Sequence, residues 1–184
     1  MLIRSRMGVS ADGFVATADG VPAFLVMPDF VPGHSHGYTA FIERCDAVLM
    51  GRSTFLPAFG APTWPWAGLE VFVLTSRPLP PETPPGVVAV PGGPADAVER
   101  LRNRGSDADV HVVGGPRTIE GLAAIGALDR LELVILPIVL GAGVPLSPPG
   151  TPQHPLALVR PPQTYPDGSV ELVYQPGNNN GGQS

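Results

Sequence analysis

The chain of 184 residues contains no lysine, so all 11 of its basic residues are arginines. The absence of a lysine amine excludes Schiff-base catalysis and the lysine that P-loop phosphate sites require. Acidic residues outnumber the arginines by 16 to 11, which gives a net charge of −5 and an isoelectric point near 5.2. A dedicated nucleic-acid-binding protein normally carries a basic field, so this class is strongly disfavoured.

Cysteine is nearly absent as well. Cys45 is the single cysteine, which excludes an internal disulfide and any zinc site built from several thiolates. The histidines have no acidic partners at ligand spacing, and we expect no metal site. No apolar run approaches the roughly 20 residues that span a bilayer, and the N-terminus lacks the features of a signal peptide. We therefore expect a soluble, cytoplasmic protein.

Hydrophobic residues make up 43% of the chain, enough to exclude global disorder in a length typical of one domain. We expect a single domain over residues 1–176 and a flexible tail over residues 177–184. Short apolar runs alternate with helix-like stretches, which predicts an α/β fold. The expected strands are residues 2–9, 46–50, 70–74, 87–90, 110–113, 131–139 and 170–174, and the expected helices are residues 38–45, 95–104 and 118–125.

One apolar strand passes through a pair of glycines directly into a helical pattern, in the run Gly114, Gly115, Pro116, Arg117 and Thr118. Glycines allow a close approach of the backbone to a pyrophosphate, and the positive end of the following helix attracts the anion. This segment is therefore a candidate phosphate site. An ordinary tight turn between a strand and a helix is the alternative interpretation.

Two further strands end in residues that suit an anion. They are followed by Gly51, Arg52, Ser53 and Thr54, and by Thr75, Ser76 and Arg77. Taken alone, the first of these segments is better explained by a solvated arginine and a Ser/Thr helix cap. Three such strand ends together favour a phosphate-rich, dinucleotide-like ligand, with Arg52 and Arg77 binding a terminal phosphate through paired hydrogen bonds.

Three residues are candidates for supplying a proton in catalysis. His34 and His36 have a suitable intrinsic pKa, although they are equally well explained as exposed loop residues. Asp12 precedes a glycine, where it either faces a cofactor or stabilises a turn through its side chain. Trp64 and Trp66 lie on a long loop and either stack on a flat substrate, cover the core or form a dimer contact.

The order of these segments resembles the dihydrofolate reductase-like superfamily over nearly the whole chain, to about residue 175. The motifs that carry the resemblance are Asp-Gly-Phe-Val-Ala at 12–16, Val-Leu-Met-Gly-Arg-Ser-Thr-Phe at 48–55, Val-Leu-Thr-Ser-Arg-Pro at 73–78, Val-Val-Gly-Gly at 112–115, Leu-Asp-Arg-Leu-Glu at 128–132 and Pro-Ile-Val-Leu-Gly-Ala-Gly at 137–143. Within the superfamily, the chain is most similar to the C-terminal reductase domain of the bifunctional deaminase-reductase of riboflavin biosynthesis. The resemblance implies a three-layer fold, with helices on both faces of a mostly parallel mixed sheet and an antiparallel C-terminal hairpin.

The resemblance also implies a cofactor and a reaction. NADPH would bind with its phosphates near Arg52, Ser53 and Thr54, its adenosine ribose phosphate near Ser76 and Arg77, and its pyrophosphate along residues 114–118. Hydride would pass to a pyrimidine or a pterin, as in 5-amino-6-(5-phosphoribosylamino)uracil reductase or dihydrofolate reductase. NADH and a deazaflavin are alternative hydride carriers. The resemblance further implies a homodimer. The alternative function is a non-catalytic protein that binds a nucleotide or another ligand and retains the fold.

The chain differs from these relatives at positions where they bind the substrate. The riboflavin reductases typically have a glutamate before the paired glycines, where this chain has Val113. Residues 20–38 show none of their machinery for the phosphate of the substrate. Dihydrofolate reductases have an acidic residue where this chain reads His34-Ser35-His36-Gly37.

Overall fold

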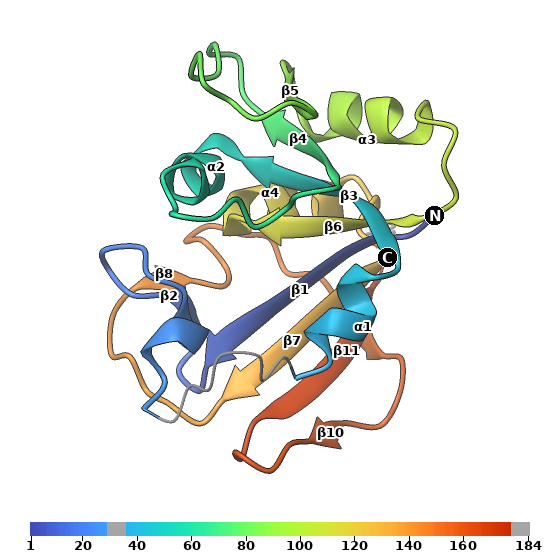
Figure 1. The fold of residues 1–184 in the computed structure, drawn as a ribbon. Coiled ribbons are helices and arrows are strands. Elements are labelled where there is room, and N and C mark those ends of the chain that lie inside the picture. Colours follow the sequence, from blue (N-terminus) through green and yellow to red (C-terminus); the bar gives the residue numbers. More distant parts are fainter. Residues whose placement is uncertain (29–35, 178–184) are drawn as a thin grey trace.

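The computed structural model describes residues 1–28 and 36–177, whose centre is a nine-stranded sheet (Figure 1). Its strands lie in the order β10-β11-β7-β1-β6-β3-β4-β5, and β9 pairs with β11 as well. The six strands from β7 to β5 are parallel, and β11 is antiparallel to β7. The strands are β1 (Ile3–Ser10), β3 (Cys45–Gly51), β4 (Glu70–Leu74), β5 (Val87–Val90), β6 (Asp109–Gly114), β7 (Arg130–Leu136), β9 (Leu156–Leu158), β10 (Gln163–Thr164) and β11 (Val170–Pro176).

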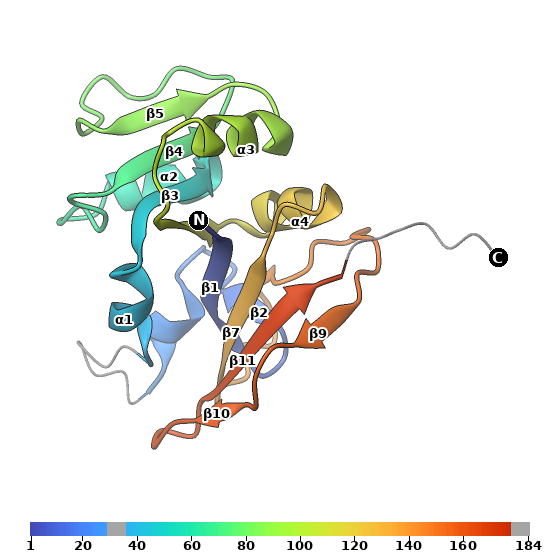
Figure 2. The same cartoon turned by 90° about the vertical axis from the view of Figure 1, so that its right-hand side faces the viewer.

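Helices cover both faces of this sheet (Figure 2). The helices α3 (Pro94–Arg102) and α4 (Pro116–Ala124) enclose one apolar core against β1, β3 and β6. On the other face, α2 (Arg52–Phe59) closes a second core, while α1 (Tyr38–Ile42) and the short helix η1 (Ala23–Val26) lie further along the same face. This arrangement confirms the expected α/β fold with a mostly parallel mixed sheet and an antiparallel C-terminal pair of strands.

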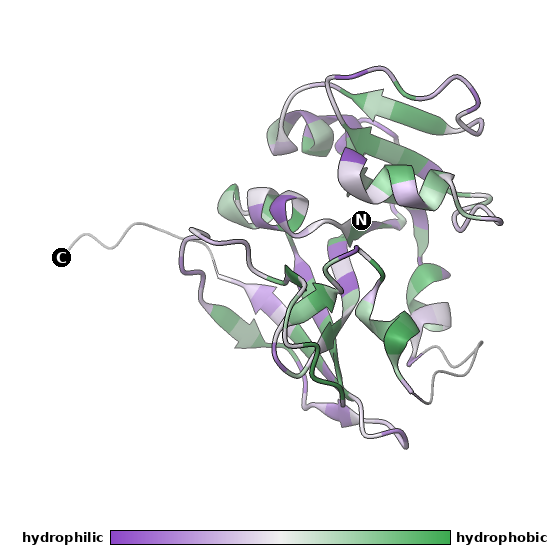
Figure 3. Ribbon diagram, turned by 90° about the vertical axis from the view of Figure 1, so that its left-hand side faces the viewer, coloured by the Kyte–Doolittle hydropathy of each residue, from purple (hydrophilic) through white to green (hydrophobic). Residues whose placement is uncertain are grey.

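The strand β3 is apolar because both of its sides are covered. Ala47, Val48, Leu49 and Met50 of β3 are all fully buried, so the strand reads as a continuous hydrophobic run without alternation. Figure 3 shows the same distribution, with hydrophobic residues concentrated in the strands. None of the helices in residues 1–28 and 36–177 is both long and apolar enough to cross a membrane.

Several element boundaries differ from those expected. The helix expected at residues 38–45 ends at Ile42, because the chain enters β3 at Cys45. The strand expected to extend to Val139 ends at Leu136, since Pro137 has no amide hydrogen to continue the ladder. The helix α2 and a small sheet of β2 (Phe14–Ala16) and β8 (Val144–Pro145) were not expected. The tail at 178–184 lies outside the described residues.

Candidate functional site

The candidate residues gather at the edge of the sheet where the parallel strands end. Their carboxyl ends follow one another in the order β4, β3, β6, β1 and β7. Gly51 at the end of β3 pairs with Leu74 of β4, and the neighbouring Met50 pairs with Gly114 of β6. Ligands of open α/β sheets bind at this kind of edge. The three predicted phosphate-binding segments therefore lie side by side.

The helices α2 and α4 begin against each other at this edge. A Cβ atom at Gly51 would lie 3.0 Å from the Thr118 hydroxyl, and one at Gly115 would lie 3.4 Å from the Thr54 hydroxyl. Gly114 has a φ of +140°, which only glycine adopts readily, and the Gly114–Gly115 peptide is cis. The absence of side chains thus lets the two helix starts approach closely.

Among residues 1–28 and 36–177, no side chain caps the N-terminus of either helix. The first amides of a helix have no partner within the helix, and the helix dipole makes this end positive. Pro116 occupies the first turn of α4, where a missing amide hydrogen costs nothing. Two uncapped helix N-termini at adjacent strand ends form a cradle that suits a pyrophosphate.

Arginine side chains border this cradle. Arg52 donates a hydrogen bond of 2.9 Å from Nη1 to the carbonyl oxygen of Pro78, which ties the start of α2 to the loop after β4. In that loop, the Thr75 hydroxyl accepts a hydrogen bond of 3.1 Å from the amide of Arg77. Within the described residues, Arg52, Arg77 and Arg117 form no ion pair with a carboxylate. Their charges are therefore available to an anionic ligand. The side chains of Ser53, Ser76, Arg77 and Arg117 are exposed.

Asp12 lies at the next strand end, after β1, and holds two loops together. Its carboxylate accepts a hydrogen bond of 2.7 Å from the Ser10 hydroxyl and bonds of 3.1 and 2.7 Å from the amides of Leu140 and Gly141. The Ser10 hydroxyl is the largest of the influences that lower the pKa of Asp12. An ionised carboxylate with these partners fits the role of stabilising a turn better than that of donating a proton.

His36 is held by a different part of the molecule. Its Nε2 atom lies 2.6 Å from Oδ2 of Asp167, in the turn between β10 and β11, and its ring contacts Tyr165 edge-on. Its carbonyl oxygen accepts hydrogen bonds from Arg6 and from the Tyr165 hydroxyl. His36 is therefore not among the residues gathered at the glycine turns. His34 lies outside the described residues.

The two tryptophans serve mainly to cover the core. Trp66 is only 7% exposed and packs in the cluster closed by α2, and Trp64 is partly buried against the same cluster. Their rings meet edge-on with centroids 5.2 Å apart. Val113, which precedes the paired glycines, packs against this cluster as well. The core beside the phosphate cradle is thus apolar and aromatic.

A buried network of charged side chains was not predicted. Arg4 binds Asp109 at 2.9 Å and Glu132 through its Nε at 2.8 Å. Arg6 binds Glu132 at 3.0 Å and also binds Glu171. All five residues are buried or nearly so. The strand β1 contains two arginines although both of its sides are covered. This pattern could have indicated that carboxylates are buried beside it.

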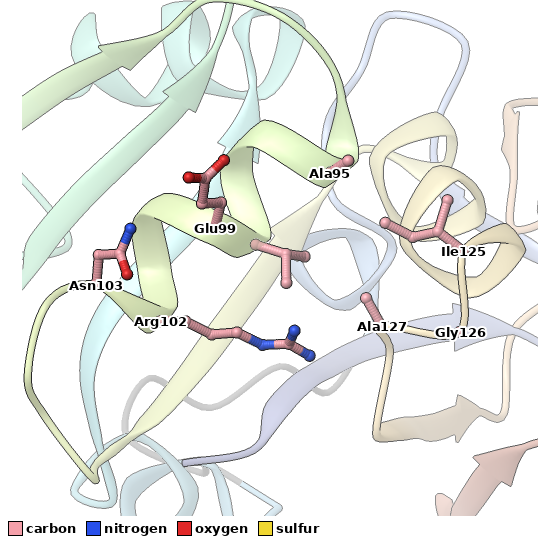
Figure 4. Close-up of a pocket in the computed structure, with 8 residues that line it drawn as sticks. Ala95, Glu99, Arg102, Asn103, Ile125, Gly126 and Ala127 are labelled. Carbon is pink, nitrogen blue, oxygen red and sulfur yellow. The ribbon is translucent and has the colours of Figure 1, made fainter.

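A hollow of about 450 Å³ lies elsewhere, between α3 and the end of α4 (Figure 4). Arg102 and the segment of Ile125 and Gly126 line it, and none of the predicted site residues does. In the described part of the chain, no three His, Cys, Asp or Glu side chains are grouped so that they could hold a metal ion.

Comparison with known proteins shows the family of this chain. The family model of the RibD C-terminal domain matches residues 2–168. The chain belongs to the RibD C-terminal domain family. Among the relatives of this RibD-like chain, YwjB of Bacillus subtilis is 27% identical over 141 residues, which cover 76% of this chain and 79% of YwjB.

Solved structures agree with this assignment. A putative riboflavin biosynthesis protein from Shewanella superimposes on the RibD-like chain with a TM-score of 0.78 and 25% identity, covering 97% of this chain and all of the other. A diaminohydroxyphosphoribosylaminopyrimidine deaminase/5-amino-6-(5-phosphoribosylamino)uracil reductase from Thermotoga maritima gives a TM-score of 0.68 at 15% identity, covering 96% of this chain and 56% of the other. The second likeness concerns the fold alone.

Proposed function

We propose that this RibD-like chain is an NADPH-dependent reductase that transfers hydride to a small pyrimidine-type heterocycle. One observation carries the proposal. The uncapped N-termini of α2 and α4 meet at the ends of β3 and β6, beside Arg52 and Arg77, neither of which has a carboxylate partner among residues 1–28 and 36–177. The family membership and the names of its relatives support the reductase chemistry.

The chain's own residues fit the cofactor. The glycines before α2 and α4 let the two helix N-termini lie close enough to bind one pyrophosphate, because Cβ atoms at Gly51 and Gly115 would contact Thr118 and Thr54. The exposed Arg77, which follows β4, suits the phosphate on the adenosine ribose of NADPH. Bound NADPH supplies the hydride, while the protein orients the two reactants and excludes water.

The acceptor also needs a proton. An imidazole held by a carboxylate is a suitable general acid, and His36 beside Asp167 has this arrangement. We propose His36 as the proton donor in preference to Asp12, whose oxygens already accept three hydrogen bonds. In a His36→Gln variant, kcat should then fall while the affinity for NADPH is unchanged.

We further propose that the chain forms a homodimer through the outer edge of the sheet. On and beside the edge strand β9, the side chains of Leu156, Leu158 and Val159 are 44%, 47% and 45% exposed. A second copy would cover this apolar strip and the unpaired strand edge. Light scattering should give twice the mass of the chain, and Leu158→Arg should give the mass of one.

The cofactor is tested by thermal unfolding in the presence of NADPH and of NADH. A ligand at a hundredfold its Kd stabilises the folded state by about 2.7 kcal/mol. We expect a clear shift with NADPH, a smaller one with NADH, and a reduced NADPH shift in Arg52→Ala and Arg77→Ala. Arg100→Ala, an exposed arginine on α3, is the matched control and should leave the shift unchanged.

The outcomes separate the alternatives. Stabilisation by neither nucleotide would overturn the proposed cofactor and point to another hydride carrier, such as a deazaflavin. Stabilisation by NADPH without oxidation of NADPH by any pyrimidine or pterin would favour a protein that binds the nucleotide without catalysis.

A further inference from the structure

We infer that Asp12 is a positioning residue for the nicotinamide end of the cofactor. Its carboxylate joins the segment that follows β1 to the segment that follows β7, and the joined unit borders the place of the nicotinamide ring. This role rests on the proposed function, because it takes the cofactor to be NADPH. It concerns the reacting half of the cofactor rather than its phosphates.

The pairing of the sheet is interrupted beside the phosphate cradle, between β1 and β6. Backbone pairing of these two strands ends at Arg4 and His111. Beyond Arg4, β1 continues beside β7 as far as Ser10, whereas β6 continues beside β3 as far as Gly114. The two strands therefore diverge towards their carboxyl ends (Figure 1).

The order of the strand ends gives the direction of the bound cofactor. In the proposed arrangement, the adenosine ribose phosphate lies at the end of β4 and the pyrophosphate lies at the ends of β3 and β6. The next strand along this edge is β1, and adjacent strands are about 4.8 Å apart. The nicotinamide ring therefore lies where β6 and β1 diverge, and the chain that follows β1 borders it.

The carboxylate of Asp12 joins two segments at this place. It accepts hydrogen bonds of 3.1 and 2.7 Å from the amides of Leu140 and Gly141, which follow β7. The hydroxyl of the buried Ser10 donates a bond of 2.7 Å to the same carboxylate and accepts one of 2.9 Å from the amide of Phe14. Asp12 is exposed, yet both of its carboxylate oxygens bind the protein itself. Its charge thus fixes the arrangement of the backbone.

Backbone hydrogen bonds extend this joint along both segments. The amide of Ala11 donates to the carbonyl oxygen of Ile138 at 2.8 Å, and the amide of Leu146 donates to that of Gly13 at 2.9 Å. The strands β2 and β8 pair as a small antiparallel sheet, which lies beside the carboxyl end of β1 in Figure 1. The two segments therefore form one unit, to which Asp12 contributes the charge-assisted hydrogen bonds.

An ordered border is important for hydride transfer, because the reacting atoms must be held about 3–3.5 Å apart. Gly141 has a φ of +73°, so the segment makes a left-handed turn at the point where Asp12 binds it. A loop that becomes ordered only when the ligand binds lowers the affinity, whereas a loop that is already ordered does not. By holding this turn, Asp12 favours binding of the nicotinamide ring in one orientation.

The test compares two nucleotides that differ in the nicotinamide ring. The probes are NADP⁺, which cannot donate a hydride, and 2′-phospho-ADP-ribose, which retains all the phosphates. Calorimetry gives both Kd values, and we expect the unmodified protein to prefer NADP⁺. Asp12→Asn should reduce this preference by about fivefold, because the amide group has one oxygen to accept hydrogen bonds where the carboxylate has two. The affinity for 2′-phospho-ADP-ribose should be unchanged.

Matched variants separate the joint from its surroundings. Asp19→Asn makes the same change at an exposed carboxylate that accepts a hydrogen bond from the Thr17 hydroxyl, and it should leave the preference unchanged. Gly141→Ala strains the turn on the other side of the joint and should reduce the preference. Gly150→Ala is its control, since Gly150 has a similar φ of +84°. At both glycines, a Cβ atom would have no other atom of the described residues within 4 Å.

Amide hydrogen exchange in the protein without ligand measures the joint directly. Asp12→Asn should accelerate exchange at Leu140 or Gly141 by at least about tenfold, since one of these amides loses its acceptor. Asp19→Asn should leave both exchange rates unchanged.

The role of Asp12 would be overturned by an unchanged preference in Asp12→Asn or Gly141→Ala, by an equal reduction in the control variants, or by equal losses of affinity for both nucleotides. Unchanged amide exchange in Asp12→Asn would also overturn it, as would equal affinities of the unmodified protein for the two nucleotides. Binding of neither nucleotide to the unmodified protein would overturn the proposed function and this role with it. Thermal unfolding with NADPH and NADH detects that case without any change at Asp12, so the two failures are distinguishable.

Discussion

Two groups of arginines in this molecule have the same side chain and opposite surroundings. Arg4 and Arg6 lie in the central strand β1, and each contacts two carboxylates. Arg52 and Arg77 lie at the ends of neighbouring strands, with no carboxylate partner in the described ranges, and Arg77 is exposed. The first group holds the sheet together, whereas the second is available to a ligand. An arginine therefore indicates an anion site only after its own partners have been counted.

The largest effect is expected from breaking the buried group. Arg6→Ala would leave Glu132 and Glu171, which are 2% and 3% exposed, without this guanidinium. Removing one partner of a buried ion pair typically costs about 3–5 kcal/mol. We expect a loss of this size in the free energy of unfolding, measured by urea denaturation. Arg77→Ala is the matched control and should change it by less than about 0.5 kcal/mol. Similar losses of unfolding free energy in both variants would contradict the distinction between the buried arginines and those at the strand ends.

A second prediction concerns His111, which lies beside Arg4 in the register of β1 and β6 and is 2% exposed. Burial is the main cause that lowers the pKa of His111 to about 3, and the charges of Arg6 and Arg4 add to it. The unfolded chain binds this proton near its ordinary pKa of about 6.5, whereas the folded chain does not. Stability must therefore fall as the pH drops below about 6.5, by at most about 1.4 kcal/mol per pH unit.

The measurement is the free energy of unfolding between about pH 6.5 and 5, above the range in which most carboxylates titrate. His111→Leu should flatten this dependence, because the leucine cannot bind a proton. The same slope in the variant and in the unmodified protein would show that His111 does not cause it.

A third prediction concerns the arginines at the strand ends and is tested by the affinity for the nucleotides. Arg77→Ala should weaken NADPH binding by about tenfold, or about 1.4 kcal/mol, with little change for NADH, because the proposed contact is with the phosphate that distinguishes them. Fluorescence titration with both nucleotides gives the two Kd values. Equal losses for NADPH and NADH would place Arg77 elsewhere on the cofactor.

The smallest effect is expected from salt. Raising the ionic strength from about 0.1 to 1 M shortens the Debye length from about 10 to 3 Å. The affinity for NADPH should fall, since Arg77 is exposed, while the coupling between Arg6 and Glu171 should change little because both are buried. A double-mutant cycle at low and high salt measures this coupling. A large decrease in the coupling would contradict its burial.

The sequence predicted local features better than distant ones. The strands β4 and β5 lie at the expected residues, because compact apolar runs between turn residues define them. The helix α2 was missed since it contains Pro57, and proline normally ends a helix. The structure gathers the predicted phosphate-binding segments at one edge, because parallel strands that carry them end there.

The partners of Arg4 and Arg6 could not be predicted in the same way. Glu132 and Glu171 are separated from Arg6 by 126 and 165 residues, so only the pairing of β1, β7 and β11 brings them together. The position of His36 against Asp167 depends on a comparable separation of 131 residues. Contacts over such distances follow from the topology of the sheet and leave no local pattern.

The position of β1 in the sheet also has a consequence for synthesis of the chain. The strand β1 leaves the ribosome well before both of its neighbours, because β6 and β7 begin more than 100 residues after Ile3. A fold dominated by such non-local pairing is slow to form. Until β6 and β7 emerge, β1 has neither of its strand partners, and Arg4 and Arg6 are its only charged residues. We expect the two guanidinium groups to keep the nascent strand hydrated and so to oppose its aggregation until their carboxylate partners are made.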